Sequence, residues 1–235
     1  MDQRNGGHTS RRKFMQLLAM LGIGGQFLFR PSDLMAAVNE AADSLSPDPS
    51  WPEMTYRKLG RTGYRSSRLI FGCGSALRSG RADRLLNTAF SAGINVFDVG
   101  TRRYYPDSER NLAPFLKKTR DEIFLISKGI LELDAKPDAA LSVQQQKAAA
   151  ATWLEMLDES LGGLGVEHVD AYYIMAANNP SLVASEEMYG AFLSAKAAGK
   201  VRFFGLSSHL NAQNVLDAAI GTWWYDLAML AVTPA

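Results

Sequence analysis

The feature that most constrains the fold is a regular alternation of short apolar segments with longer amphipathic ones. From residue 54 onward the short segments are rich in β-branched and aromatic residues, and several are apolar almost throughout. This pattern predicts strands that are buried on both faces. The predicted strands span 68–71, 94–97, 123–126, 169–174, 201–206 and 225–232. Segments with helical periodicity lie between them, at 82–91, 109–118, 143–161, 185–198 and 211–220.

Such an alternation implies parallel strands joined by right-handed crossovers, in either a barrel or an open doubly wound sheet. Polar or reactive residues follow five of the predicted strands: Cys73, Asp98, Ser127 with Lys128, Asn178 with Asn179, and Ser207 with Ser208 and His209. Barrel enzymes collect their functional groups from several strand ends at one face, so this recurrence favours a TIM-type barrel.

A dinucleotide-binding open sheet is the alternative, because Gly72-Cys73-Gly74 follows the first predicted strand and Asp98 ends the second. Leu77 occupies the position of the third glycine, however, and Asp98 lies further downstream than the usual ~20 residues. The barrel therefore remains the predicted fold.

Composition narrows the classes of partner. The 235 residues are 47% hydrophobic, which is enough for one sizeable core, and 25 basic residues balance 24 acidic ones. A chain with a net charge of only +1 has no strong field that would attract nucleic acid, so we expect no nucleic-acid partner. The single cysteine excludes an intrachain disulfide and CxxC metal motifs, and the three scattered histidines do not have ligand spacing, so we expect no metal.

The N-terminal segment resembles a twin-arginine export signal. Arg11 and Arg12 precede an apolar run, 14–29, that is interrupted by glycines and is shorter than the ~20 residues of a membrane-spanning helix. The alternative is a basic N-terminus with a short core helix. We expect a signal at 1–42, a proline-rich linker at 43–53 and a folded domain at 54–235. The resemblance implies folded export by the twin-arginine machinery to the periplasm or beyond, with cleavage or membrane tethering both open.

Asp98 and Lys128 are the first candidates for a functional pair. A lysine at the end of an apolar strand is costly to bury unless it is paired, and Asp98 at the neighbouring strand end is the available carboxylate. A cation beside a tyrosine lowers the pKa of the phenol and makes it a better proton donor. Tyr104 or Tyr105 can supply that phenol. Spacing alone leaves open that Lys128 extends to solvent and that the tyrosines only cap a loop.

Six segments are similar, in order, to blocks of the aldo-keto reductase family and cover residues 56–232: RKLGRTGYRSSRLIFG, AGINVFDVG, YPDSE, RDEIFLISK, ESLGGLGVEHVDAYYI and AGKVRFFGLSSH. The resemblance implies a (β/α)8 barrel that binds NADPH without a Rossmann motif and reduces small carbonyl compounds. It also implies an Asp, Tyr, Lys and His catalytic group. Asp98 and Lys128 match directly. Counting back from Glu109 gives Tyr105 as the tyrosine, which we favour, whereas counting forward from Asp98 gives Arg103.

By the same resemblance, Cys73, Ser207 and Ser208 are the candidate cofactor contacts, although the family has asparagine where Ser208 stands. Met175 replaces the expected histidine, and a thioether cannot donate a hydrogen bond to a substrate carbonyl. Loss of such a donor typically costs about 10²–10³ in rate. His209 is the alternative donor.

Six predicted strands make an incomplete barrel, which a truncated product, a fragment, a dimer or a chain completed by a partner would each explain. Two functions follow: an exported NADP(H)-dependent reductase with Asp98, Tyr105 and Lys128 as catalytic residues, or a catalytically silent barrel that binds a small molecule or a protein.

Overall fold

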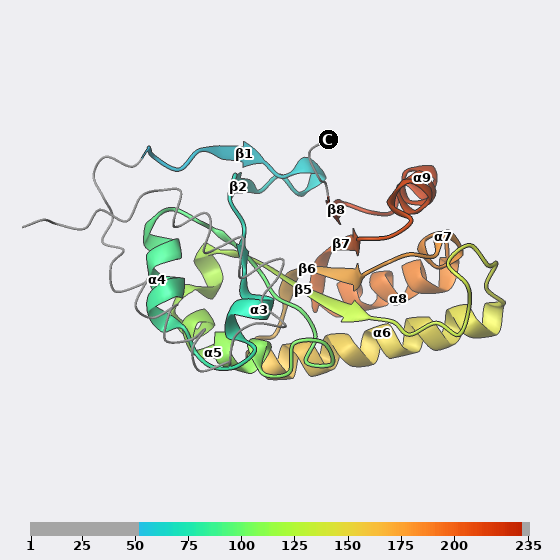
Figure 1. The fold of residues 1–235 in the computed structure, drawn as a ribbon, viewed down its shortest axis with the longest axis horizontal. Helices are drawn as coiled ribbons and strands as arrows, with labels where there is room; N and C mark the ends of the chain where they lie inside the picture. Colours follow the sequence, from blue (N-terminus) through green and yellow to red (C-terminus); the bar gives the residue numbers. More distant parts are fainter. Residues whose placement is uncertain (1–51, 232–235) are drawn as a thin grey trace, which may run out of the picture.

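The computed structural model describes residues 52–231 (Figure 1). The predicted export signal and most of the predicted linker lie outside this range. Within it, none of the helices combines the length and apolarity that crossing a membrane would require.

A six-stranded parallel sheet forms the centre of the molecule, with strand order β3-β4-β5-β6-β7-β8. Its strands are β3 (Phe71–Gly72), β4 (Val96–Asp98), β5 (Phe124–Ile130), β6 (Val169–Met175), β7 (Val201–Ser208) and β8 (Leu227–Leu230). Each strand pairs with the next strand in the sequence, as the crossover rule predicts. The curled sheet confirms the predicted fold class, an incomplete TIM-type barrel.

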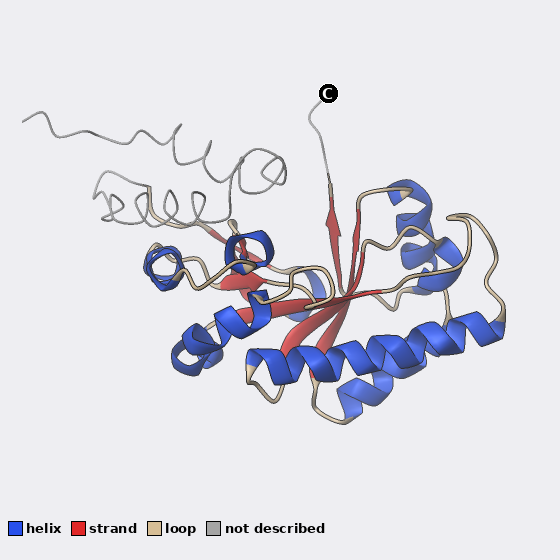
Figure 2. Ribbon diagram, turned by 60° about the horizontal axis from the view of Figure 1, so that its bottom comes forward, coloured by secondary structure: helices blue, strands red, loops and turns tan. Residues whose placement is uncertain are grey.

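Helices connect the strands, and the long helix α6 runs beneath several of them (Figure 2). The helices are α3 (Cys73–Leu77), α4 (Asp83–Ser91), α5 (Ser108–Thr119), α6 (Val143–Leu164), α7 (Pro180–Val183), α8 (Glu186–Ala197) and α9 (Ala212–Thr222), with a 3-10 turn η2 (Arg120–Glu122). Helix α6 begins with a capping box in which Ser142 and Gln145 satisfy each other's backbone N–H groups. The short helices α3 and α7 are not evident in the sequence pattern.

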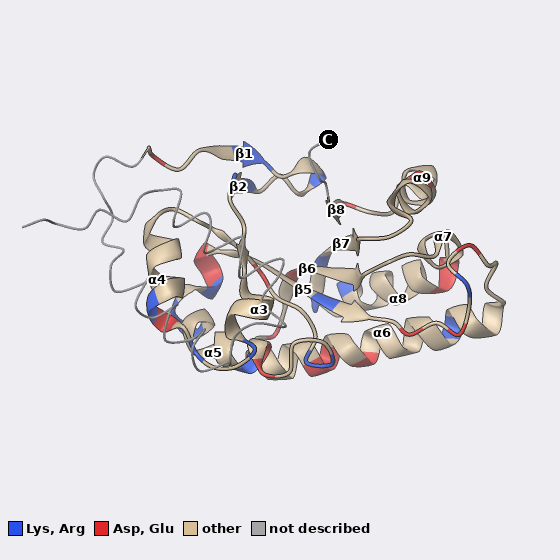
Figure 3. Cartoon of the chain, in the orientation of Figure 1, with Lys and Arg blue, Asp and Glu red and all other residues tan. Residues whose placement is uncertain are grey.

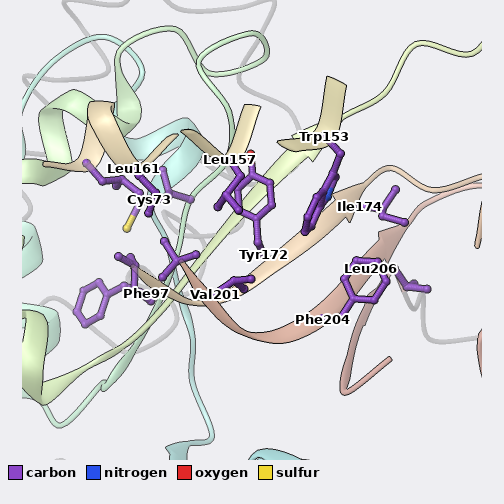
Figure 4. Close-up of a cluster of buried hydrophobic side chains, with 14 of the residues drawn as sticks. Cys73, Phe97, Trp153, Leu157, Leu161, Tyr172, Ile174, Val201, Phe204 and Leu206 are labelled. Carbon is purple, nitrogen blue, oxygen red and sulfur yellow. The ribbon is translucent and has the colours of Figure 1, made fainter. Parts of the chain in front are cut away.

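Side chains alternate between the two faces of the sheet, which produces two apolar clusters. The larger cluster lies between the sheet and the helices, where Trp153 of α6 packs edge-on against Tyr172 and Phe204 (Figure 4). The smaller cluster lies on the opposite, inward face of the sheet. Its buried members are Val96, Phe124, Ile126, Ala171, Tyr173 and Leu227. The candidate site lies on this inward face, at the carboxyl ends of the strands.

An N-terminal hairpin packs at the other end of the inward face. It consists of β1 (Tyr56–Lys58), a 3-10 turn η1 (Gly60–Thr62) and β2 (Arg65–Ser67). Tyr64 packs on Phe124, with a ring-centroid distance of 5.1 Å, and Arg61 donates to the Trp223 carbonyl at 3.2 Å. The hairpin therefore links the first half of the sheet to the segment before β8. The alternation pattern did not predict this hairpin.

The first predicted strand is shorter than expected. The sequence predicts a strand over 68–71, but β3 begins at Phe71, and Leu69 and Ile70 are 49% and 42% exposed. Three helices are followed by a glycine with positive φ before the next strand: Gly93, Gly165 and Gly199 have φ values of 89°, 65° and 72°. Only glycine adopts this left-handed conformation without strain.

Candidate active site

Asp98 and Lys128 form an ion pair at the carboxyl ends of β4 and β5. Asp98 is the last residue of β4, and Lys128 lies two residues beyond the partner of Asp98 on β5, so both side chains point inward. The Lys128 ammonium also donates to the Val99 carbonyl at 2.8 Å, and Lys128 is only 5% exposed. Burial raises the pKa of Asp98, and the nearby lysine opposes that rise. The predicted pairing is therefore present.

The loop after β4, residues 99–107, is tied to the end of β5 by backbone hydrogen bonds. The Val99 amide donates to the Ile126 carbonyl at 2.9 Å, and the Thr101 amide donates to the Lys128 carbonyl at 3.0 Å. Lys128 thus contacts this loop through both its backbone and its side chain. The loop carries the candidate proton donor.

Tyr105 lies over two glycines that give its ring room. A Cβ atom on Gly74 would come within 2.6 Å of the Tyr105 ring, and one on Gly100 would come within 3.3 Å. The ring stacks edge-on against Tyr104, with centroids 4.7 Å apart. Both glycines are therefore needed for the observed position of the phenol.

The pKa of Tyr105 is raised, which corrects the expectation that a cation would lower it. Burial is the main cause, and Tyr104 and Asp98 add to the rise. The groups that oppose it are the Ser75 side chain, as a hydrogen-bonding partner, and Arg78. In this structure, therefore, helix α3 and the residue after it, rather than Lys128, supply the groups that favour the phenolate. The phenol keeps its proton at neutral pH and is available as a donor.

The alternative residues in the loop point elsewhere. The Arg103 guanidinium lies 3.2 Å from Glu159 and 3.8 Å from Glu155, both on α6, and Tyr104 is exposed. Of the three candidates, Tyr105 is the one that lies beside Gly74 and Gly100. Its catalytic role stays a prediction.

Met175 is the last residue of β6, at the position expected for a histidine. Its sulfur lies 3.6 Å from the point that a Cβ atom on Gly100 would occupy, which places it beside the Tyr105 ring. His209, the alternative donor, follows β7 and is exposed. The substrate-binding roles of both residues stay predictions.

The three candidate cofactor residues differ in whether their side chains are free to bond a ligand. Ser207 lies on the inward face, and its Oγ accepts a bond from the Ala176 amide at 3.1 Å, which leaves its own hydrogen for a ligand. The Ser208 hydroxyl donates to the Leu210 carbonyl at 2.8 Å. Cys73 is fully buried as the first residue of α3, and burial raises the pKa of its thiol. Ser207 is therefore the candidate whose side chain fits a bound carboxamide.

Tyr173 closes the inward face below these residues, and the sequence pattern did not reveal it. It is the register partner of Lys128, and its ring covers Gly205 so closely that a Cβ there would lie 2.2 Å from a ring carbon. Burial and the Asp98 charge both raise its pKa. A signal was present in the alternation of residues along β6, which places residue 173 on the same face as Met175.

The charged and titratable side chains of the described residues are not arranged as a metal centre. Across residues 52–231, no group of three or more histidine, cysteine, aspartate or glutamate side chains is placed to hold a metal ion. Acidic and basic residues are distributed over many elements in Figure 3. The site is therefore built from one buried ion pair, a phenol and hydroxyl groups.

The chain is similar in sequence to known proteins. Residues 71–233 match the model of the aldo/keto reductase family. L-glyceraldehyde 3-phosphate reductase from Escherichia coli K12 is 29% identical over 169 residues, which cover 67% of this chain and 46% of that enzyme, and the enzyme of strain O157:H7 matches equally. The chain thus spans about half the length of these relatives.

Solved structures agree with the fold. A putative aldo-keto reductase from Pseudomonas aeruginosa is 26% identical with a TM-score of 0.57, over 74% of this chain and 66% of that one. An aldo-keto reductase from Bacillus halodurans in its holo form has a TM-score of 0.57 at 23% identity, over 77% of this chain and 58% of that one. Because the family model covers more than half of the chain, the chain belongs to the aldo/keto reductase family.

Proposed function

We propose that the chain is an NADPH-dependent reductase of small carbonyl compounds in which Tyr105 is the proton donor. The observation that carries this proposal is the buried Asp98–Lys128 pair, which lies at the same end of the strands as Tyr105. A buried ion pair usually costs free energy rather than supplying it, so its presence at strand ends supports a functional role.

The residues fit a nicotinamide cofactor in part. The Ser207 hydroxyl, at the end of β7, has a hydrogen that would bond the carboxamide oxygen, whereas the Ser208 hydroxyl is directed to Leu210. When bound, NADPH supplies a hydride. Support for NADPH rather than NADH comes from the family resemblance alone.

Reduction of a carbonyl places negative charge on its oxygen, and Tyr105 would then transfer the phenolic proton to that oxygen. An alkoxide is a far stronger base than a phenolate, so this transfer is favourable even with the raised pKa of Tyr105. The Ser75 side chain and Arg78, which favour the charged form of Tyr105, would stabilise the phenolate once it forms. Asp98 holds the Lys128 ammonium beside the Val99 carbonyl. Met175 supplies no hydrogen-bond donor, so substrate orientation falls to the remaining groups.

Export in the folded state is part of the proposal and rests on Arg11, Arg12 and the apolar run after them. A cofactor-binding protein that folds before export is consistent with a twin-arginine signal. Completion of the barrel by a second copy or by a partner chain is likewise proposed from the open edges of the six-stranded sheet.

Purified full-length chain tests the reductase proposal. We expect NADPH to quench tryptophan fluorescence, and NADPH to be consumed with a panel of small aldehydes and quinones. The panel includes L-glyceraldehyde 3-phosphate, for which the Escherichia coli relative is named. Tyr105→Phe should lower kcat by at least about 10²-fold, because it removes the general acid.

Tyr104→Phe is the matched control, since this exposed ring neighbours Tyr105 and should leave turnover within about twofold. Failure to bind NADPH at millimolar concentration would instead favour the catalytically silent barrel. Full turnover by Tyr105→Phe would show that another residue is the acid.

A further inference from the structure

Glu109 is the second residue of α5, where an acidic side chain interacts favourably with the helix dipole. The structure also buries it, with 2% of its surface exposed, behind the strand that carries Lys128. A carboxylate this deeply buried is expensive unless polar groups surround it. The polar groups around the Glu109 carboxylate therefore show which elements it connects.

The first neighbour of Glu109 is Ser127, the residue before Lys128 on β5. The Ser127 hydroxyl donates to Glu109 Oε1 at 2.7 Å across the outer face of the sheet. Because side chains alternate along a strand, Ser127 faces α5 while Lys128 faces Asp98. The bond therefore fixes the backbone at the base of the Lys128 side chain.

The second and third neighbours connect Glu109 to the loop and to α6. The backbone N–H of Arg102, in the 99–107 loop, and the Ser160 side chain of α6 both favour the charged form of the carboxylate, which lowers its pKa. Ser160 also lies 3.1 Å from the Tyr172 hydroxyl, which extends the polar cluster into β6. Glu109 also closely follows the 99–107 loop in the chain, and the Ser108 amide donates to the Tyr105 carbonyl at 3.2 Å. The Glu109–Ser127 bond therefore joins the end of the loop that carries Tyr105 to the strand that carries Lys128.

A fourth contact fixes the same turn of α5 from the other side. The hydroxyl of Ser108 donates to the Gly74 carbonyl at 2.6 Å, and Gly74 is the residue on which the Tyr105 ring lies. The start of α5 is therefore held both to β5, through Glu109, and to α3, through Ser108. Tyr105 lies between these two attachments.

We propose that Glu109 is a positioning residue that fixes the Tyr105 loop against the strand that carries Lys128. The proposal rests on the function proposed above for Tyr105 and Lys128. Glu109 does not contact the inward face, so it acts on the reaction only through the placement of those two groups. Misplacement of reacting groups by about 1 Å can cost up to about 10²-fold in rate.

Burial of the Glu109 carboxylate costs free energy, so the residue is not explained by a contribution to stability alone. Its second oxygen, Oε2, has no hydrogen-bond partner in the described part of the chain, and the same holds for Oε2 of Glu159 nearby. Burial raises the pKa of Glu109, and Glu159 adds to that rise, while Ser127, Ser160 and the Arg102 amide oppose it.

The test compares Glu109→Ala, Glu109→Gln and Ser127→Ala with the parent chain, and uses Glu187→Ala as the matched control. Glu187 is also the second residue of a helix, α8, but it is partly exposed and lies 3.8 Å from Lys147 in a loose ion pair. Glutamine keeps an acceptor for the Ser127 hydroxyl and the shape of the side chain. Ser127→Ala keeps Glu109 and removes the bond to β5, and it covers the case in which Glu109→Ala does not fold.

Two readouts are measured on each folded variant: amide hydrogen exchange of residues 99–107, and kcat and KM for NADPH and an aldehyde. For Glu109→Ala and Ser127→Ala we expect loop amides such as those of Thr101 and Tyr105 to exchange at least about tenfold faster, with core amides of β6 unchanged. We expect kcat to fall about 10–100-fold with KM for NADPH within about twofold. Glu109→Gln should restore most of both values, and Glu187→Ala should match the parent.

Uniform acceleration of exchange across the sheet, or unchanged loop exchange in Ser127→Ala and Glu109→Ala, would overturn the proposal in favour of a purely structural role. A parent chain that does not consume NADPH would refute the reductase function. Loop exchange would still decide, in that case, whether Glu109 holds the loop.

Discussion

The two ends of the parallel sheet each contain an aspartate with little exposure, and the two side chains are held in opposite ways. Asp170, at the start of β6, accepts from the guanidinium groups of Arg120 and Arg202, each at 2.9 Å, and from the Leu125 amide at 2.9 Å. Asp98, at the end of β4, is held by the ammonium of Lys128.

This difference in bonding indicates that Asp170 has a structural role, whereas Asp98 is available for chemistry. Both oxygens of Asp170 are bonded, and its partners come from η2, β5 and β7, so the cluster locks three strands and a helix end together. For Asp98 the cost of burial outweighs the attraction of Lys128, so its pKa is raised. At the carboxyl ends of the strands, the charge of Asp98 therefore costs free energy of folding. At the amino ends, the charge of Asp170 stabilises the packing of its neighbours.

The largest expected effect is on Asp170. Asp170→Ala leaves Arg120 buried without its carboxylate and should lower the free energy of unfolding by about 3 kcal/mol, measured by urea denaturation. Asp158→Ala is the control, because its pair with Lys200 is exposed and should contribute less than about 1 kcal/mol. Equal losses of unfolding free energy in Asp170→Ala and Asp158→Ala would show that the Asp170 cluster has no special structural role.

A double replacement tests whether the Asp98–Lys128 pair costs stability rather than contributing to it. Asp98→Asn combined with Lys128→Met removes both charges from the strand ends and should leave the free energy of unfolding within about 1 kcal/mol of the parent, or raise it. Lys128→Met alone should lower it by about 2 kcal/mol, because Asp98 then remains buried without a cation. Chemical denaturation of the three variants measures these differences. A double variant as unstable as Asp170→Ala would show that the pair is a stabilising element.

The smallest expected effect is a difference in pH dependence. In the unfolded chain Asp98 loses its proton near its ordinary pKa of 3.8, whereas the folded chain keeps the proton to a higher pH. Between these two values the folded state binds more protons, so the free energy of unfolding falls as the pH rises. Asp98→Asn lacks this contribution and should show a shallower fall over the same interval.

Denaturation curves of the parent and of Asp98→Asn across the acidic range measure that difference. Glu109, whose pKa is also raised, contributes in the same direction in both proteins and cancels in the comparison. A parent that instead gains stability relative to Asp98→Asn as the pH rises would mean that Lys128 dominates burial, and the two aspartates would then be alike.

Much of this arrangement could be predicted from the sequence, because it depends on local pattern. Alternating segments predicted the parallel sheet, and the positions of Asp98 and Lys128 at the ends of apolar runs predicted that they share one end of it. Period-2 alternation also decides which face each residue occupies. These properties need no knowledge of distant contacts.

The contacts that could not be predicted join residues far apart in the chain. Asp170 meets Arg120 and Arg202 only after a helix and two strands have packed, and nothing in their spacing indicates that cluster. The burial of Glu109 depends on the approach of α5 to β5 in the same way. The expectation for the pKa of Tyr105 was wrong because it considered Lys128 and omitted burial, the largest cause.

The contact between Tyr173 and Gly205 limits how the ligand space of this protein can diverge. Because the Tyr173 ring occupies the volume that any side chain at position 205 would need, position 205 can change only if residue 173 changes with it. A larger residue at 205 requires a smaller one at 173, which would open the floor beside Lys128. Mutational libraries that seek new substrates should therefore vary these two codons as a single unit, since a side chain added at position 205 alone would clash with the Tyr173 ring.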